Sequence, residues 1–170
     1  ITPGGTVSTL AGLAGSSGSV DGVGSAARFN APRCIAVDSG GTVYVADTFN
    51  NRILVYTPIS ATTPTTCIGQ PDLVTGTANS GSGGAAGGLN APLGLLYVPS
   101  TQVAFGDTLF VADSGNHRVL VYKNASKLPP FATAPADIVY GHATMTDTSA
   151  SATPTATSLS LPSSVAVTAN

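Results

Sequence analysis

A chain of 170 residues, 42% of them hydrophobic, is long enough for one domain with a core and too apolar for a disordered segment. Its formal net charge of −2, without a basic stripe, removes the usual electrostatic basis of nucleic-acid binding, and no apolar run approaches the ~20 residues that cross a bilayer. Charged residues make up only 8% of the chain, against roughly 25% in an average soluble domain. Because serine, threonine, glycine and alanine take their place, the composition favours an extracellular or surface-displayed protein.

An internal repeat organises the chain. Residues 45–56 read VADTFNNRILVY and residues 111–122 read VADSGNHRVLVY, so eight of twelve positions are identical at an offset of 66 residues. An Asn-Ala-Pro tripeptide at 30–32 recurs at 90–92, and a third copy begins with LPSSVAV at 161–167. A period of this kind indicates a fold built by stacking similar units.

Each unit is predicted to contain four short antiparallel strands. Gly or Pro interrupts every long stretch, so apolar residues never follow a helical period over a full window. Four-stranded units repeated along a chain predict an all-β fold, a β-propeller with about two and a half blades in this chain. The strands are expected at 34–37, 42–46, 52–57 and 65–68 in the first unit and at 94–98, 108–112, 118–123 and 137–140 in the second.

The repeat also predicts how the chain is divided into segments. Two blades are separated by a Gly/Ser-rich loop and followed by a Ser/Thr-rich loop, with a partial unit at each end. The expected segments are 1–29 (the last strand of a preceding blade and a linker), 30–69 (blade 1), 70–89 (loop), 90–142 (blade 2), 143–160 (loop) and 161–170 (the first strand of a third blade).

Seven runs of the chain carry a family resemblance. They are PRCIAVD at 32–38, VYVAD at 43–47, NNRI at 50–53, VAD at 111–113, NHRV at 116–119, GTVSTLAG at 5–12 and IGQPD at 68–72. With these runs the two units resemble the NHL-repeat family, and the linking runs are similar to those of its bacterial secreted members. Cys34 and Ser164 depart from the glycine that usually begins the first strand. The resemblance implies a propeller that closes with about six blades, which two complete units cannot do alone. We therefore expect a fragment of a longer chain or copies that assemble.

The most distinctive polar residues recur in both units, which favours a structural role over a catalytic one. Each Asp is expected to cap its turn, while each Arg ties neighbouring blades through charge-assisted hydrogen bonds. A catalytic His117 would not be replaced by Asn51 in the sister blade. The predicted structural signature is Asp47, Asn50, Arg52, Asp113, Asn116, His117 and Arg118.

Other candidate sites carry weaker signals. His142 could be a ligand or base but has no partner nearby in sequence. Asp21 offers one carboxylate where a calcium loop needs several oxygen ligands. Cys34 and Cys67 fall on the first and fourth strands of one unit, about 14 Å apart at ~4.8 Å per strand, beyond the ~7 Å between Cα atoms that a disulfide allows. We expect both thiols to be free and buried.

The function predicted from these features is a non-catalytic extracellular structural or protein-interaction module. The expected partner is another protein or a second copy, joined through open strand edges, with no nucleic acid, membrane span, metal or cofactor. The alternative is a fragment of a propeller enzyme, a lyase or hydrolase, whose active site lies largely in missing blades.

Overall fold

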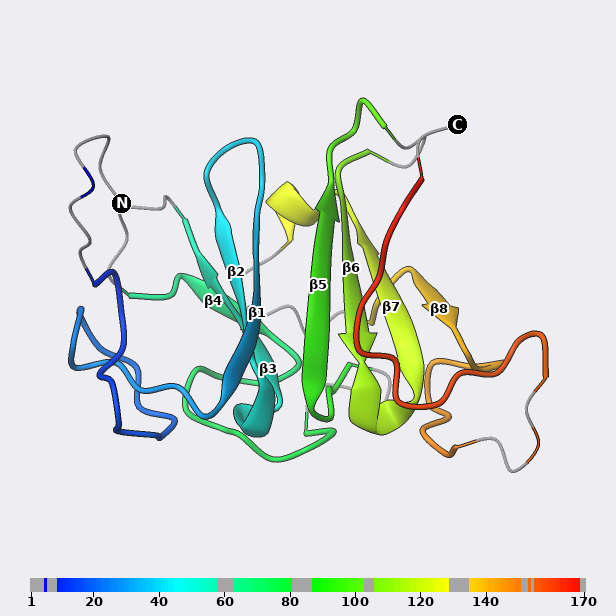
Figure 1. Cartoon of the computed structure of the whole chain (residues 1–170), viewed down its shortest axis with the longest axis horizontal. Coiled ribbons are helices and arrows are strands. Elements are labelled where there is room, and N and C mark those ends of the chain that lie inside the picture. The colour runs from blue at the N-terminus through cyan, green and yellow to red at the C-terminus, as the bar shows by residue number, and fades with distance from the viewer. Residues whose placement is uncertain are drawn as a thin grey trace.

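The computed structural model describes residues 5, 9–57, 63–80, 87–102, 106–128, 135–150, 153 and 155–168. The chain forms two four-stranded antiparallel sheets that stand side by side (Figure 1). In each sheet every strand pairs with its neighbours in sequence, in the orders β1-β2-β3-β4 and β5-β6-β7-β8. The predicted all-β fold with four-stranded units is therefore confirmed. No helix in the described part of the chain is long and apolar enough to cross a membrane.

The strands lie within two residues of their predicted bounds. Alternating burial along β1 and near-continuous burial along β3 follow from their places at the edge and in the middle of the sheet. A register irregularity after Pro32 and after Pro92 begins both first strands. The strands are β1 Pro32–Val37, β2 Val43–Asp47, β3 Arg52–Tyr56, β4 Thr66–Ile68, β5 Pro92–Val98, β6 Thr108–Asp113, β7 Arg118–Lys123 and β8 Ile138–Tyr140.

Short polar turns join the strands. Asp38 closes the β1–β2 turn, where its Oδ1 accepts hydrogen bonds from the backbone N–H groups of Gly40 at 2.9 Å and Thr42 at 2.7 Å. The β2–β3 turn contains the 3-10 segment η1, Thr48–Asn50, and the β6–β7 turn contains η3, Ser114–Asn116. A third such segment, η4, Ala125–Lys127, follows β7.

The main core lies between the two sheets. Tyr44 and Tyr97 stack across this interface with ring centroids 6.5 Å apart. The backbone N–H of Leu95 on β5 donates a hydrogen bond to Cys34 Sγ on β1 at 3.3 Å. The first strands of the two sheets, β1 and β5, are therefore in direct contact, and we call them the inner strands. The buried side chains of this core are Tyr44, Ala46, Ile53, Val55, Ile68, Leu89, Leu109, Val111, Leu120, Tyr122, Ala125 and Ala136.

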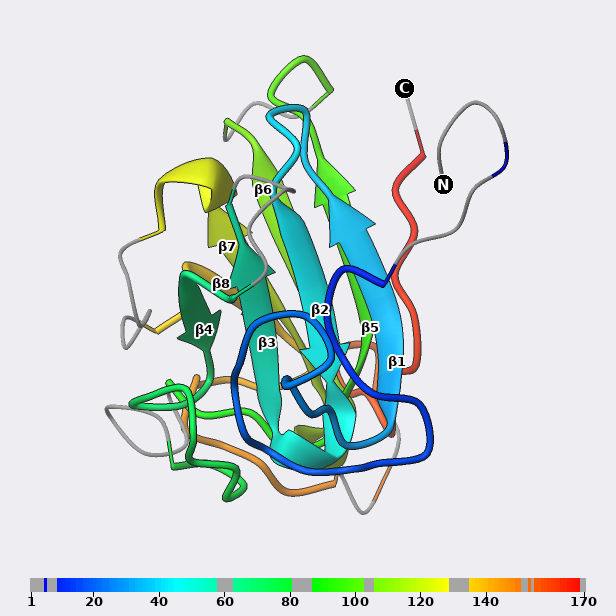
Figure 2. The ribbon, with the colours of Figure 1, turned by 90° about the vertical axis from the view of Figure 1, so that its left-hand side faces the viewer.

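A smaller core lies on the opposite face of the first sheet. Val43, Leu54, Tyr56 and Cys67 are buried there. Ala11 and Phe29 of the N-terminal segment and Leu73 pack against them as partly buried neighbours. In Figure 2 this segment crosses the sheet in front of β2 and β3.

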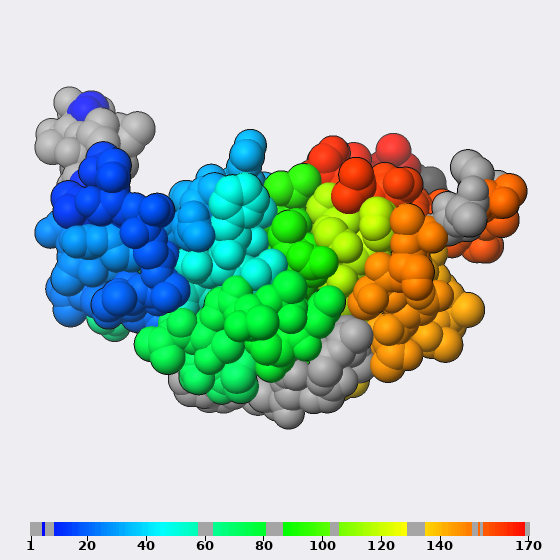
Figure 3. All heavy atoms as spheres, turned by 90° about the horizontal axis from the view of Figure 1, so that it is seen from below, coloured from blue at the N-terminus to red at the C-terminus, as the bar shows by residue number. Residues whose placement is uncertain are grey.

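The C-terminal segment packs against the second sheet. A Cβ placed on Gly94 would lie 2.6 Å from Ser163 O and 2.9 Å from Ser164 Cα, so residues 163–164 approach β5 as closely as a glycine allows. Figure 3 shows the N-terminal and C-terminal segments at opposite ends of the molecule.

The first residue of this segment has the same backbone as its repeat equivalents. Leu161 has a φ of 46°, close to the 49° of Ala31 and the 47° of Ala91, and each of the three precedes a proline. In the described structure residues 161–168 form no strand hydrogen bonds. Their assignment to a third blade stays a prediction, as do the other segment boundaries. Parts of both predicted loops, 81–86 together with 151–152 and 154, lie outside the described residues.

Candidate functional site

The signature residues of the first unit form a buried network at the end of β2. Arg52 and Asp47 are both fully buried, and the Arg52 Nε–H donates to Asp47 Oδ2 at 2.8 Å. The Asn50 side-chain amide donates to the same oxygen at 2.9 Å. Asp47 Oδ1 accepts the backbone N–H of Asn30 at 2.7 Å, so one carboxylate joins β2 to the residues that precede β1.

The second unit repeats this network. Arg118 Nε–H donates to Asp113 Oδ2 at 2.7 Å, and both side chains are fully buried. Asp113 also accepts hydrogen bonds from the Asn116 side chain at 2.8 Å and the Asn90 backbone at 2.7 Å. Burial raises the pKa of Asp113, and the guanidinium of Arg118 opposes the rise.

Each arginine also holds the linkers that enter and leave its blade. Arg52 donates to the carbonyl oxygens of Ser19, at 3.2 Å, and of Leu73. Arg118 donates to the carbonyl oxygens of Gly88, at 2.8 Å, and of Met145. These contacts direct the guanidinium donors to the chain itself rather than to solvent.

The predicted capping role of the two aspartates is wrong. Neither Asp47 nor Asp113 caps the 3-10 turn that follows it by accepting a hydrogen bond from a backbone N–H of that turn. Their oxygens are instead taken by the Arg, by the Asn and by a backbone N–H of the segment before the first strand. These donors satisfy both oxygens of each carboxylate, which matters because burial makes an unmet carboxylate costly.

In each unit the side chain between the signature Asn and Arg, Asn51 or His117, accepts a hydrogen bond from the backbone at the start of the next unit. Asn51 and His117 both adopt left-handed backbone, with φ of 52° and 56°. Asn51 Oδ1 accepts the backbone N–H of Ala91 at 2.8 Å, and His117 Nδ1 accepts the backbone N–H of Leu161 at 3.2 Å. The amide oxygen of Asn and the imidazole nitrogen of His can both accept this hydrogen bond, which explains why one unit has Asn and the other His at this position. Sequence analysis alone did not identify Asn51 as part of the network.

His142 occupies the position that Gln70 holds in the first unit. Its Nε2 lies 2.9 Å from the carbonyl oxygen of Asn116, and its Nδ1 lies 3.5 Å from Asp147 Oδ2. Gln70 instead donates to the carbonyl oxygen of Asn51 at 2.8 Å, one residue further along the repeat than the carbonyl that His142 contacts. Both ring nitrogens of His142 therefore lie close to oxygen atoms of the chain itself.

Asp21 is a partly buried carboxylate of the N-terminal segment and lies outside the network that the two units share. It lies 3.5 Å from Arg52 and its side chain is 14% exposed. Among the described residues neither carboxylate oxygen receives a hydrogen bond. Burial raises the pKa of Asp21 to about 6, although Arg52 acts in the opposite direction.

Replacing Asp21 with Asn should therefore stabilise the protein at neutral pH. An acid with a raised folded pKa binds more protons in the native state, so stability falls as pH rises from about 4 to about 6 and stays low above that range. Solvent screening reduces the gain from Asp21→Asn to about 1–2 kcal/mol at pH 7.5, and it should vanish near pH 4. Urea unfolding between pH 4.5 and 7.5 measures this.

Asp72→Asn is the control for that experiment. Hydrogen bonds from Thr75 and Val74 lower the pKa of Asp72, so its own ionisation does not change between pH 4.5 and 7.5. Its effect on stability should change much less with pH than that of Asp21→Asn. An effect of Asp21→Asn that is no more dependent on pH would show that burial of the Asp21 carboxylate does not govern the pH dependence.

The two cysteines are free, as expected. They lie on opposite faces of the first sheet: Cys34 packs against the core between the sheets, and Cys67 belongs to the smaller core. Cys67 is buried, which raises its pKa to about 11 and makes the thiol inert. Cys34 is only half-buried, which corrects the expectation of burial. It lies on the edge strand β1, which has a neighbour on one side only.

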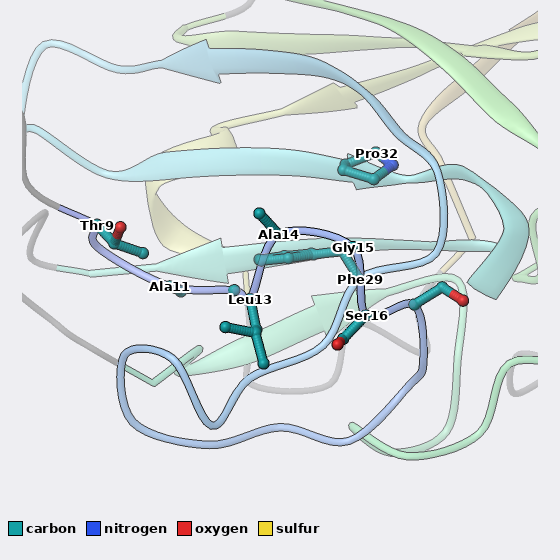
Figure 4. Close-up of a pocket in the computed structure, with 10 residues that line it drawn as sticks. Thr9, Ala11, Leu13, Ala14, Gly15, Ser16, Phe29 and Pro32 are labelled. Carbon is teal, nitrogen blue, oxygen red and sulfur yellow. The ribbon is translucent and has the colours of Figure 1, made fainter.

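Two hollows on or beside the outer face of the first sheet are lined mainly by residues that do not titrate, with Tyr56 as the exception. The larger, of about 610 Å³, is drawn in Figure 4 and is lined by residues of the N-terminal segment together with Phe29 and Pro32, none of them titratable. The smaller, of about 280 Å³, is almost wholly apolar. No group of three His, Cys, Asp or Glu residues that could hold a metal occurs in the described part of the chain. The smaller hollow is lined by Leu10, Ala11, Phe29, Pro32, Ile35, Val43, Val45 and Tyr56.

Comparison with known protein families finds a match within the first unit. The family model described as NHL repeat matches residues 29–56, the segment that contains β1, β2, η1 and β3. No curated protein matches the chain. Residues 29–56 are therefore similar to an NHL repeat, and the two four-stranded sheets are blades of the β-propeller type.

Proposed function

We propose that this chain is a non-catalytic extracellular structural or protein-interaction module, which associates with itself or forms part of a longer propeller. NHL repeats indicate a propeller-type protein-interaction module. The self-association, the structural role and the location outside the cell extend that indication.

One observation carries the proposal. The recurrent charged residues that could have formed a reactive site (Asp47, Arg52, Asp113 and Arg118) are completely buried and bonded to the chain itself. Apolar side chains are instead exposed at the surface of the first blade, where Ile35 is 62% and Val37 49% exposed. A surface of this kind suits binding of another apolar surface better than it suits catalysis.

The covalent and solution masses together test the proposal. Light scattering gives the mass of the particle, and intact-mass measurement gives the chain isolated from its source. A particle well above the 16.7 kDa of this chain, or a natural chain that continues into further blades, supports the proposal. A natural chain of 170 residues that stays at 16.7 kDa in solution overturns it.

The location needs a separate test. Lys127 is exposed in the structure, so an amine reagent that cannot cross membranes should label it on intact source cells if the protein is displayed outside. Labelling only after the cells are lysed would contradict an extracellular location.

A further inference from the structure

The outer face of the first blade is built from the same strand positions as a face that is already buried inside the molecule. The second blade uses one face to pack on the first, and its residues have register equivalents in the first blade. For example, the neighbouring residues Leu95, Val111 and Leu120 of the second blade have their equivalents in the first blade. These are Ile35, Val45 and Leu54. We call the surface formed by Ile35, Val37, Val43 and Val45 the head face.

The head face is only partly covered. Leu95 and Tyr97 are half-buried in the core between the blades, whereas their equivalents Ile35 and Val37 are 62% and 49% exposed. The smaller apolar hollow opens beside Ile35. The N-terminal segment therefore covers the part of this face that lies on β2 and β3 (Figure 2). It leaves the side chains of Ile35 and Val37 on β1 exposed.

The blade–blade contact inside the chain shows what fits such a face. The backbone N–H of Leu95 on β5 donates to Cys34 Sγ on β1, and Tyr97 on β5 stacks on Tyr44 of β2. On this face β1 itself presents the small side chains Cys34 and Ala36. Large apolar side chains on one inner strand thus pack against small ones on the next.

The other end of the molecule presents the matching partner. Residues 161–168 lie against the inner strand β5 and begin with the backbone geometry of a first strand. In the repeat, Ser164 and Ala166 stand where Cys34 and Ala36 stand, and both are exposed. We call Ser164 and Ala166 the tail strand surface.

We propose that the head face of one copy of this chain binds the tail strand surface of a second copy, in the manner in which the second blade binds the first. This interface would repeat the observed blade–blade interface, because large side chains on an inner strand of one copy would again meet small side chains on the strand of the next unit. A contact between two different surfaces is heterologous, so it extends head to tail and closes into a ring or grows into a filament. The inference rests on the proposed function and names the partner and the surfaces.

Two single substitutions test it, because each blocks one end only. Ile35→Glu places a charge on the head face, and Ala166→Glu places one on the tail strand surface; both positions are exposed, so folding should survive, as circular dichroism can verify. Each variant alone should remain at 16.7 kDa by light scattering. A 1:1 mixture should form a particle of two chains, because the intact tail of one variant meets the intact head of the other.

Val74→Glu is the matched control, since Val74 is also 62% exposed but lies outside the head face, and this variant should associate like the unsubstituted chain. If Ala166→Glu alone still associates while Ile35→Glu does not, the contact joins two head faces and the proposal is overturned. If the chain associates but neither substitution matters, this interface is wrong while the proposed function stands. A monomer cut from a longer natural chain also overturns the inference, because the occupant is then the adjacent blade of that chain.

Discussion

Replacing Arg118 with Met should lower the free energy of unfolding by about 3–5 kcal/mol, because it leaves a buried carboxylate without its counter-charge. Asp113 would keep two hydrogen bonds, from Asn90 and Asn116, but would lose the guanidinium 2.7 Å away. The carbonyl oxygens of Gly88 and Met145 would lose a donor in the same step. Urea unfolding at pH 7.5 measures the change.

Two further variants separate the causes. Asp113→Asn combined with Arg118→Met removes both charges and should recover part of the loss, while the unmet carbonyl groups keep the rest. Lys127→Met removes an exposed charge and should change stability by no more than about 0.5 kcal/mol. A loss below 1 kcal/mol in Arg118→Met would contradict the importance of the buried pair.

Replacing Leu120 with Ala should cost about 2–5 kcal/mol and lie near the upper end of that range. Leu120 is fully buried in the core between the blades, where side chains from both sheets surround it. Rigid strands on both sides limit collapse around the cavity, so most of the lost packing is not recovered. Calorimetry or chemical unfolding measures the difference from the unsubstituted chain.

Leu54→Ala is the matched comparison, because Leu54 holds the same position in the first blade and is equally buried. It lies in the smaller core, where the N-terminal segment rather than a second sheet completes the packing. A segment without strand pairing can adjust more readily, so this substitution should cost less than Leu120→Ala at low protein concentration. Equal costs would show that the N-terminal segment packs as rigidly as a blade.

Much of the fold follows from local pattern. Alternating apolar residues bounded by Asp, Gly and Asn placed the strands within two residues, and the recurrence of the same twelve-residue run showed that two equivalent sheets exist. Asp38 closes its turn because the Asp of an Asp-Ser-Gly-Gly turn accepts hydrogen bonds from the local backbone that follows it.

The hydrogen-bond partners of the signature residues could be predicted from the sequence only in part. The sequence singled out Asp47 and Arg52 by their recurrence but assigned them separate roles, whereas the structure joins them, with Arg52 Nε 2.8 Å from Asp47 Oδ2. The carbonyl oxygens that take the remaining guanidinium donors, those of Ser19 and Leu73, have no sequence signature, because every residue carries the same carbonyl group. The predicted turn cap failed because side-chain donors three and five residues further on, together with a distant backbone N–H, take the oxygens of each Asp.

By itself the sequence determined the all-β class, the four-stranded unit, its turns and the residues that recur, since these depend on neighbours along the chain. Only the tertiary structure decided which face of each blade is buried, that Asn51 and His117 hold the start of the following unit, and that Ile35 and Val37 are exposed. Those features depend on contacts between residues about 40 or more positions apart, and the alternation within a strand is the same whether its face meets another blade or solvent.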